Sequence, residues 1–278
     1  MRNALTVDVE EWFHICGMEG DLSPSNWSSF PSRVVGNTRL LLDLLDRLQT
    51  RATFFVLGWV AERYPGLVGL IREAGHEIGS HGYLHRRVYE LDPAGFEQEL
   101  ERSLAALAGA GARSIRGFRA PEWSINDRSL WALDILAQKG FCFDSSMTPL
   151  RLIGNPAYPQ VPHRRPTSFG EILEFPPLVA RRLGQNIPLG GGWGLRMSGP
   201  RAVLKEIESR NRRGSPVALF VHPWELDPDP PRITLPLPLR FSHYFKLSGY
   251  RERLEQIFAG AEFGPMGEVL GVGREQAA

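Results

Sequence analysis

The chain has 278 residues, of which 42% are hydrophobic and 23% are charged, and these values are ordinary for a globular protein. Its formal net charge of +1 lacks the basic excess that a sequence-nonspecific nucleic-acid binder carries. No apolar run approaches the length of a membrane span, and the N-terminus lacks the apolar core of a signal peptide. We therefore expect a cytoplasmic protein with no membrane span and no nucleic-acid partner.

Two cysteines, Cys16 and Cys142, stand far apart in the chain. Two distant cysteines form neither a disulfide framework nor a zinc knuckle. We expect two reduced thiols, with Cys142 in a buried strand, which is in keeping with a reducing compartment.

Strand and helix patterns alternate along the first half of the chain. The helix over 59–75 is expected to be interrupted near Pro65, and the helix over 91–111 is expected to be capped by Asp92. The expected strands cover 3–10, 52–58, 76–81, 114–121 and 141–146, and the expected helices cover 36–51, 59–75, 91–111 and 126–140.

The second half of the chain is less regular. Proline and polar residues over 148–170 predict a long loop, and a second irregular excursion is expected over 227–247. The glycine-rich stretch 188–200 is expected to lead into a helix. The remaining expected strands cover 171–180 and 216–225, and the remaining expected helices cover 200–214 and 248–260.

This alternation from residue 4 to residue 222 predicts a parallel α/β sheet. Six or seven strand–helix units favour a barrel-like arrangement, with an open sheet as the alternative. In both architectures functional side chains lie just beyond the C-terminal ends of the strands.

Acids, histidines and one arginine follow five of the expected strands. They include Asp8, Glu10 and Glu11, then His81 and His85, then Arg119 and Glu122, then Asp144, and finally His222. Two histidines and one carboxylate are a usual ligand set for catalytic zinc. Residues two apart in a strand point to the same face, so both Asp8 and Glu10 can reach one site. One of these acids would bind the metal and the other would accept a proton.

The motifs resemble those of the polysaccharide deacetylases, the NodB-homology proteins of carbohydrate esterase family 4. The resemblance extends from residue 5 to about residue 225. The motifs are TVDVEE at 6–11, SHGYLH at 80–85, RAP at 119–121, FDSS at 143–146 and LFVH at 219–222. The opening VDVEEWFH and the late RFSHYFKL further resemble a subgroup encoded near exopolysaccharide synthesis genes.

This resemblance implies a deformed (β/α) barrel of the NodB-homology type, with long irregular loops in the C-terminal half. A single catalytic domain would cover 1–278, with a core over about 4–225 and a C-terminal extension over about 226–278. The implied activity is metal-dependent removal of acetyl groups, chiefly N-acetyl, from an acetylated polysaccharide or oligosaccharide. The implied cofactor is a divalent metal ion, for which we expect Zn²⁺.

The resemblance also implies roles for individual residues. Asp8 matches the general base, Arg119 the residue that orients it, and His222 the general acid. Asp144 matches the acid that holds and tunes that histidine. His81 and His85 match the metal-binding histidines.

Two positions depart from the family pattern. The usual adjacent aspartates are replaced by Asp8-Val9-Glu10, so Glu10 is the expected metal ligand and Glu11 the alternative. Glu122 occupies a position that is commonly tyrosine. The family uses the backbone N–H at that position to stabilise an oxyanion, so the side-chain change need not abolish that role, although it would change the electrostatics at the rim.

Two other functions remain open. Relatives with this fold hydrolyse cyclic amides or other non-peptide C–N bonds, and a carbohydrate-binding pseudoenzyme is a further alternative. Aromatic residues in and beside the two irregular segments could stack on sugar rings or pack the loops. They are Tyr158, His163, Trp224, Phe241 and Tyr244.

Overall fold

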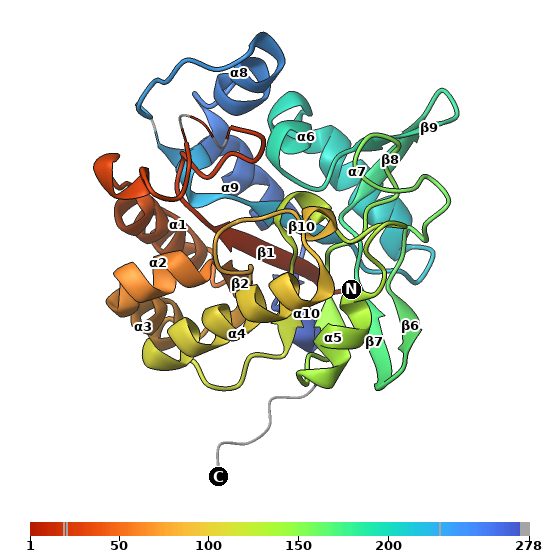
Figure 1. Cartoon of the computed structure of the whole chain (residues 1–278). Coiled ribbons are helices and arrows are strands. Elements are labelled where there is room, and N and C mark those ends of the chain that lie inside the picture. Colours follow the sequence, from red (N-terminus) through yellow and green to blue (C-terminus); the bar gives the residue numbers. More distant parts are fainter. Residues whose placement is uncertain (19, 21, 228, 273–278) are drawn as a thin grey trace.

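The computed structural model describes residues 1–18, 20, 22–227 and 229–272. Within these residues nine strands form one curved sheet, a half-barrel, in the order β10-β1-β2-β3-β4-β5-β7-β6, with β11 paired to β1 (Figure 1). The strands are β1 Asn3–Val9, β2 Thr53–Val56, β3 Glu77–Ser80, β4 Gly117–Phe118, β5 Phe143–Asp144, β6 His163–Thr167, β7 Gly170–Glu174, β10 Ala218–Val221 and β11 Phe263–Gly264.

All neighbours in this sheet are parallel except β6 and β7, so the predicted deformed barrel is confirmed. Ten α-helices accompany these strands among the described residues. They are α1 Val34–Arg47, α2 Gly58–Arg63, α3 Pro65–Glu73, α4 Pro93–Gly109, α5 Ala132–Gln138, α6 Gly192–Met197, α7 Pro200–Asn211, α8 Leu237–Tyr244, α9 Tyr250–Gly260 and α10 Met266–Val269.

Strand β1 lies between β10 and β2, and all seven of its residues are buried. Successive side chains of a strand point to opposite faces. Leu5, Val7 and Val9 pack in one hydrophobic cluster with residues of α1, α3, α7 and α9. Thr6 and Asp8 alternate with them, and their oxygens meet Arg119 from β4 across the interior. The outer face of β1 therefore builds the core and its inner face builds the site.

The helix break at Pro65 and the helix cap at Asp92, both predicted for the first half of the chain, are confirmed. Pro65 separates α2 from α3, and the Asp92 carboxylate accepts the Gly95 N–H at 2.7 Å to cap α4. Cys16 and Cys142 are both free thiols. The expected burial was wrong for Cys142, which is half-buried, whereas Cys16 is buried.

The irregular segments of the second half contain more structure than their sequences predict. The segment 148–170, expected to be a loop, includes β6, which tolerates Pro166 because it is the last strand of the sheet. The glycine-rich 188–200 forms α6, and 227–247 forms α8, which has a proline in its first turn. Strands β8 Val179–Arg182 and β9 Gln185–Pro188 form a separate hairpin.

Candidate active site

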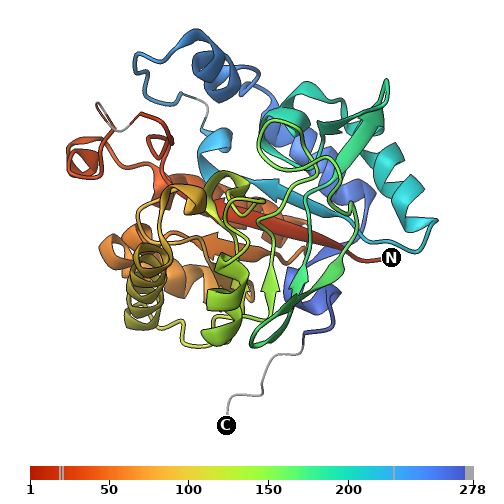
Figure 2. The ribbon, with the colours of Figure 1, turned by 45° about the vertical axis from the view of Figure 1, so that its right-hand side comes forward.

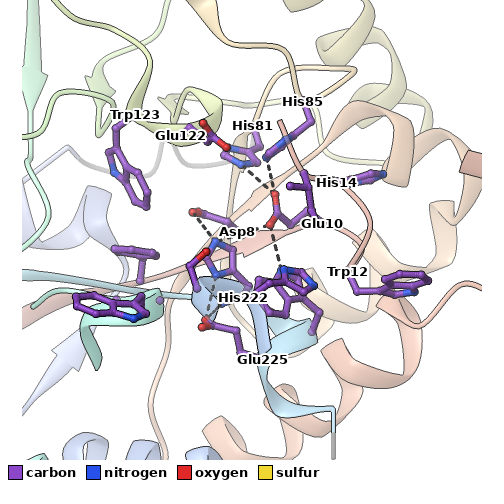
Figure 3. Close-up of a pocket in the computed structure, with 18 of the residues that line it drawn as sticks. Asp8, Glu10, Trp12, His14, His81, His85, Glu122, Trp123, His222 and Glu225 are labelled. Carbon is purple, nitrogen blue, oxygen red and sulfur yellow. Dashed lines mark hydrogen bonds and ion pairs between the residues drawn. The ribbon is translucent and has the colours of Figure 1, made fainter. Parts of the chain in front are cut away.

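The register of the parallel strands brings the catalytic candidates to one level. Val7 of β1 pairs with Val221 of β10, so the next residues, Asp8 and His222, lie side by side. Ser80 of β3 pairs with Phe118 of β4, which places His81 beside Arg119 in the same way. The carboxyl ends of these strands therefore open into one pocket (Figure 3).

This pocket has a volume of about 300 Å³. Polar side chains form its floor, and aromatic side chains form much of its wall. The polar residues that line it include Asp8, Glu10, His81, His85, Glu122, His222 and Glu225, and the aromatic ones include Trp12, Trp123, Trp193, Phe220 and Trp224. A concave site with a few convergent polar groups is the usual form of a small-ligand pocket.

Three of the lining residues, Glu10, His81 and His85, form a cluster suited to a metal ion. Their donor atoms all lie within 4.8 Å of one another. Glu10 Oε2 is 2.6 Å from His85 Nε2 and 3.8 Å from His81 Nε2. The carbonyl oxygen of Arg119 lies 2.8 Å from His81 Nδ1, which leaves Nε2 turned toward the cluster.

The electrostatics of this cluster favour a positive charge at its centre. Burial raises the pKa of Glu10, but the imidazoles of His85 and His81 outweigh burial and hold that pKa well below its usual range. The carboxylate is therefore ionised although it is buried. Two imidazoles and one ionised carboxylate are a donor set that fits a catalytic divalent cation.

The alternative ligand, Glu11, lies outside the cluster. Its carboxylate accepts the Ser32 hydroxyl and the Arg33 backbone N–H. Burial raises the pKa of Glu11, and its carboxylate is bonded by Ser32 and by backbone N–H groups, whereas His14 meets only the Glu11 backbone N–H. Glu10, on the same face of the chain as Asp8, is the acid that reaches the two histidines.

Asp8 is held by Arg119 in the buried interior of the barrel. Arg119 Nη1 donates to Asp8 Oδ1 at 2.8 Å and to the Thr6 hydroxyl at 2.7 Å. Its other nitrogens donate to the Ser145 carbonyl and hydroxyl oxygens. One carboxylate oxygen of Asp8 is thereby fixed, and the other, Oδ2, faces His222 Nε2 at 3.9 Å.

His222 is held by a carboxylate that the sequence analysis did not select. Glu225 Oε2 is 3.0 Å from His222 Nδ1 and also accepts the His222 backbone N–H. Burial lowers the pKa of His222, but Glu225, with help from Glu10 and Asp8, outweighs burial and raises it to about 9. The imidazole is therefore protonated at neutral pH, with Nε2 directed into the pocket.

The prediction that Asp144 holds His222 was wrong. Asp144 lies on β5, whereas His222 follows β10 at the other end of the sheet order. Its register partner on the next strand is Glu174, and its carboxylate accepts the Ser146 hydroxyl. Burial raises the pKa of Asp144 to about 6 and raises that of Glu174 well above its usual range, so these two acids share a proton site of their own.

Glu225 could have been found by its spacing. It lies three residues after His222 in the short helix Pro223–Leu226, where its side chain returns to the residue that begins the helix. This is the arrangement of a capping box, here with an imidazole as the first partner. A second buried residue, Arg196 of α6, is 2.9 Å from Glu225 Oε1 and fixes the carboxylate from its other side.

Glu122 lies at the rim of the pocket with its backbone in the left-handed region, at φ 51°. A side chain is uncommon in this conformation, which frequently marks functional sites. The carboxylate of Glu122 pairs with Arg87 Nε at 2.7 Å. The charge introduced in place of the family's tyrosine is thus balanced locally, and the backbone remains beside the pocket.

Trp224 joins the Glu10, His81 and His85 cluster to His222. Its Nε1–H donates to Glu10 Oε1 at 3.1 Å, and its ring stacks on His222 at 5.3 Å. His243 of α8 stacks on Trp224 at 4.3 Å. Trp224 thus orients the second oxygen of the carboxylate whose first oxygen faces His81 and His85.

Replacing Trp224 with Phe should weaken metal binding about 10- to 100-fold, because the donor that orients Glu10 is lost while the stacked ring is kept. Competition with a chromogenic chelator would measure this affinity. Phe220→Leu is a control that changes an aromatic wall residue without touching Glu10. Equal metal affinity of Trp224→Phe and wild type would show that the hydrogen bond does not support the site.

Two of the other aromatic candidates form hydrogen bonds through their hydroxyl groups. The Tyr158 hydroxyl donates to Asp127, and the Tyr244 hydroxyl donates to the Pro231 carbonyl and accepts the Ile233 N–H. These contacts favour loop packing for both residues. Phe241 is exposed and does not line the pocket.

The fold and the site define a class: a curved (β/α) barrel with an aspartate–arginine pair, a histidine–carboxylate pair and a two-histidine, one-carboxylate cluster at its strand ends. Two family profiles match successive parts of the chain. Residues 25–141 match the family profile "Polysaccharide deacetylase", and residues 145–271 match "Domain of unknown function (DUF3473)".

Individual relatives agree with this match. A peptidoglycan deacetylase-like protein of Gibberella zeae is 31% identical over 110 residues, which are 39% of this chain and 32% of that protein. A peptidoglycan-N-acetylglucosamine deacetylase of Bacillus cereus is 29% identical over 120 residues, 39% of this chain and 44% of that protein. The chain thus spans less than half the length of these relatives.

The fold has a solved counterpart over nearly the whole chain. A structure from Mycobacterium smegmatis, assigned as a polysaccharide deacetylase, has a TM-score of 0.61 at 21% identity and covers 98% of this chain and 91% of that one. This likeness supports the fold, and the profile match to the polysaccharide deacetylases covers residues 25–141. His222 and Glu225 come from the second matched region, whose strand β10 pairs with β1 in the same sheet.

Proposed function

We propose that the chain is a metal-dependent hydrolase that removes acetyl groups, chiefly N-acetyl groups, from a polysaccharide or oligosaccharide. The observation that carries this proposal is the meeting of three units in one pocket. They are Asp8 held by Arg119, His222 held by Glu225, and the Glu10, His81 and His85 cluster. Amide hydrolysis needs a base, an acid and a means of stabilising an oxyanion, and each unit supplies one of these.

The cation that fits the cluster is zinc, held by Glu10, His81 and His85, and when bound it supplies Lewis-acid activation. Asp8 accepts the proton of the attacking water on Oδ2, because Arg119 occupies Oδ1. Nε2 of His222 donates a proton to the departing sugar nitrogen. The C–N bond breaks, and acetate and a free amine are released.

The protonation state of His222 suits this role. Its pKa of about 9 keeps the imidazole protonated at neutral pH, so that it can act as the acid in acetamide hydrolysis. An amine is a poor leaving group. Cleavage of the amide C–N bond therefore needs an acid within reach of the nitrogen more than cleavage of an ester C–O bond does. The backbone N–H of Glu122 at the rim would donate to the oxyanion. Relatives named for peptidoglycan deacetylation support an N-acetylated substrate.

The remaining sequence-based expectations are proposals of the same kind. The VDVEEWFH and RFSHYFKL segments support a place in exopolysaccharide synthesis, and the expected location is cytoplasmic. Acetate release from a panel of acetylated oligosaccharides, with and without a chelator, tests the activity. Release that a chelator leaves undiminished, or no release from any acetylated sugar, would contradict the proposal.

Metal content offers a direct test of the cluster. Wild-type protein should carry about one divalent ion per chain, and His81→Ala should lose it because only two donors remain. Elemental analysis of the purified proteins measures this. His163→Ala removes an imidazole from β6, outside the pocket, and should keep the metal. Equal metal content in His81→Ala and wild type would place the ion elsewhere.

A further inference from the structure

Two short helices at the pocket mouth carry an unusual share of exposed apolar side chains. Helices α6 and α8 hold four of the twelve large hydrophobic residues that are exposed among those described, and Phe245, the residue after α8, is a fifth. On α8 and the residue after it, Leu237 is 79% exposed, Phe241 46% and Phe245 36%. These three residues are four apart, so they form one stripe along the helix. Phe241 and Phe245 stack on each other at 4.3 Å.

The segment that carries this stripe has charges of one sign. Residues 230–251 contain four cationic side chains and neither aspartate nor glutamate. Arg240 and Lys246 are exposed, and Lys246 Nζ lies 5.7 Å from the centre of the exposed Phe245 ring. An apolar aromatic face edged with lysine and arginine is typical of a helix that lies in the interface of an anionic membrane. The cationic side chains are complementary in charge to an anionic lipid surface, and this favours lipid as the occupant of the face.

Helix α8 is also part of the pocket. Leu239, Ser242 and His243 line the cavity, while Leu237 and Phe241 point away from it. Buried Arg196 of α6 donates to the carbonyl oxygens of Ser242, His243 and Phe245 and pairs with Glu225. The apolar stripe is therefore joined through Arg196 to the side chain that holds His222.

We propose that α8 is an interfacial docking helix, by which the protein binds an anionic lipid surface with its pocket mouth at that surface. None of the described helices has the length and apolar character needed to cross a membrane, so the binding is peripheral. If the proposed deacetylation holds, its substrate is a glycan that is held at a lipid surface. The docking itself does not depend on that activity.

Cosedimentation of the purified full chain with lipid vesicles tests the docking. Wild type should bind vesicles of phosphatidylcholine and phosphatidylglycerol and bind phosphatidylcholine alone weakly. Arg240→Gln with Lys246→Gln should weaken binding about 25-fold, at about fivefold for each cation removed. Phe241→Ser with Phe245→Ser should abolish most of it, because the apolar anchor is lost.

Phe169→Ser is the matched control. It also removes an exposed phenyl ring, but from the β6–β7 turn, which lies at the opposite end of the molecule from α8 in both ribbon views (Figures 1 and 2). This variant should bind as wild type does, and thermal unfolding should show that all variants are folded. Absence of binding to the anionic vesicles, or equal loss in Phe169→Ser, would overturn the proposal.

Size-exclusion chromatography without lipid tests whether a second copy of the chain, and not lipid, binds to this face. Monomeric wild type supports the lipid assignment. An oligomer that dissociates in the Phe241→Ser and Phe245→Ser protein would overturn it and make α8 a contact between copies. Vesicle binding without acetate release would refute the proposed activity alone, so the two proposals fail separately.

Discussion

Asp8→Asn should lower turnover by about 10²- to 10⁴-fold while leaving the metal in place. This is the range that a positioned general base contributes, and an amide cannot accept the proton of the attacking water. Asn retains an oxygen that Arg119 can bond, so the geometry of the pocket should persist. Turnover and metal content measured on the same preparation give the result.

Two neighbouring acids provide the controls for Asp8. Glu10→Gln should weaken metal binding, because Glu10 is the carboxylate of the cluster. Glu11→Gln changes the next acid along the chain, whose carboxylate is bonded by Ser32 and Arg33. This variant should keep both metal and turnover. An Asp8→Asn protein without metal, together with a Glu10→Gln protein that retains it, would mean that the two acids have exchanged roles.

The Asp8→Asn protein should also be less stable. Arg119 would keep its positive charge in the interior with no carboxylate beside it. Removing one partner of a buried ion pair costs about 3–5 kcal/mol of unfolding free energy in typical cases. Denaturant unfolding measures this loss, and turnover should be assayed at a temperature at which the variant remains folded.

Glu225→Gln should move the alkaline limb of the kcat/KM profile to lower pH by about 1–3 units. The alkaline limb reports loss of the proton from the acid His222, whose pKa of about 9 is raised by the Glu225 carboxylate against the opposing effect of burial. Without that charge the folded-state pKa falls, and the histidine is deprotonated at a lower pH. Activity at neutral pH should fall, with partial recovery under more acidic conditions.

Asp144→Asn tests whether Asp144, the acid that the sequence analysis assigned to His222, affects the pKa of that histidine. The partners of Asp144 are Ser146 and Glu174, so the alkaline limb should stay at the wild-type position. A limb that moves in Asp144→Asn and stays in Glu225→Gln would restore the assignment from the sequence. Near-normal activity of His222→Ala would remove the general-acid role from His222 altogether.

Arg196 makes Glu225→Gln costly for folding as well. Arg196 is buried and its guanidinium pairs with Glu225 Oε1 at 2.9 Å. The substitution leaves this charge without a carboxylate, and we expect a loss of the same order as in Asp8→Asn. The pH profile distinguishes the catalytic effect, because reduced stability lowers the amount of active protein without moving the alkaline limb by itself.

Local sequence determined the position of the candidate metal-binding cluster and of Asp8. Asp8 and Glu10 share a face because a strand alternates with a period of two, and His81 and His85 follow the next-but-one strand. The alternation of apolar strands with amphipathic helices determined the parallel sheet, and a parallel sheet places all of these strand ends together. These features depend on short-range periodicity and on one general rule of topology, so they can be predicted without coordinates.

Only the tertiary structure decided which carboxylate serves His222. Asp144 and Glu225 both lie near strand ends in the sequence, but the strand order separates β5 from β10 and places Asp144 beside Glu174. The link from Trp224 to Glu10 joins residues 214 positions apart, and the Arg196 contacts with α8 span irregular segments. Such contacts depend on how the sheet curves and how the loops pack, and neither leaves a periodic signal in the sequence.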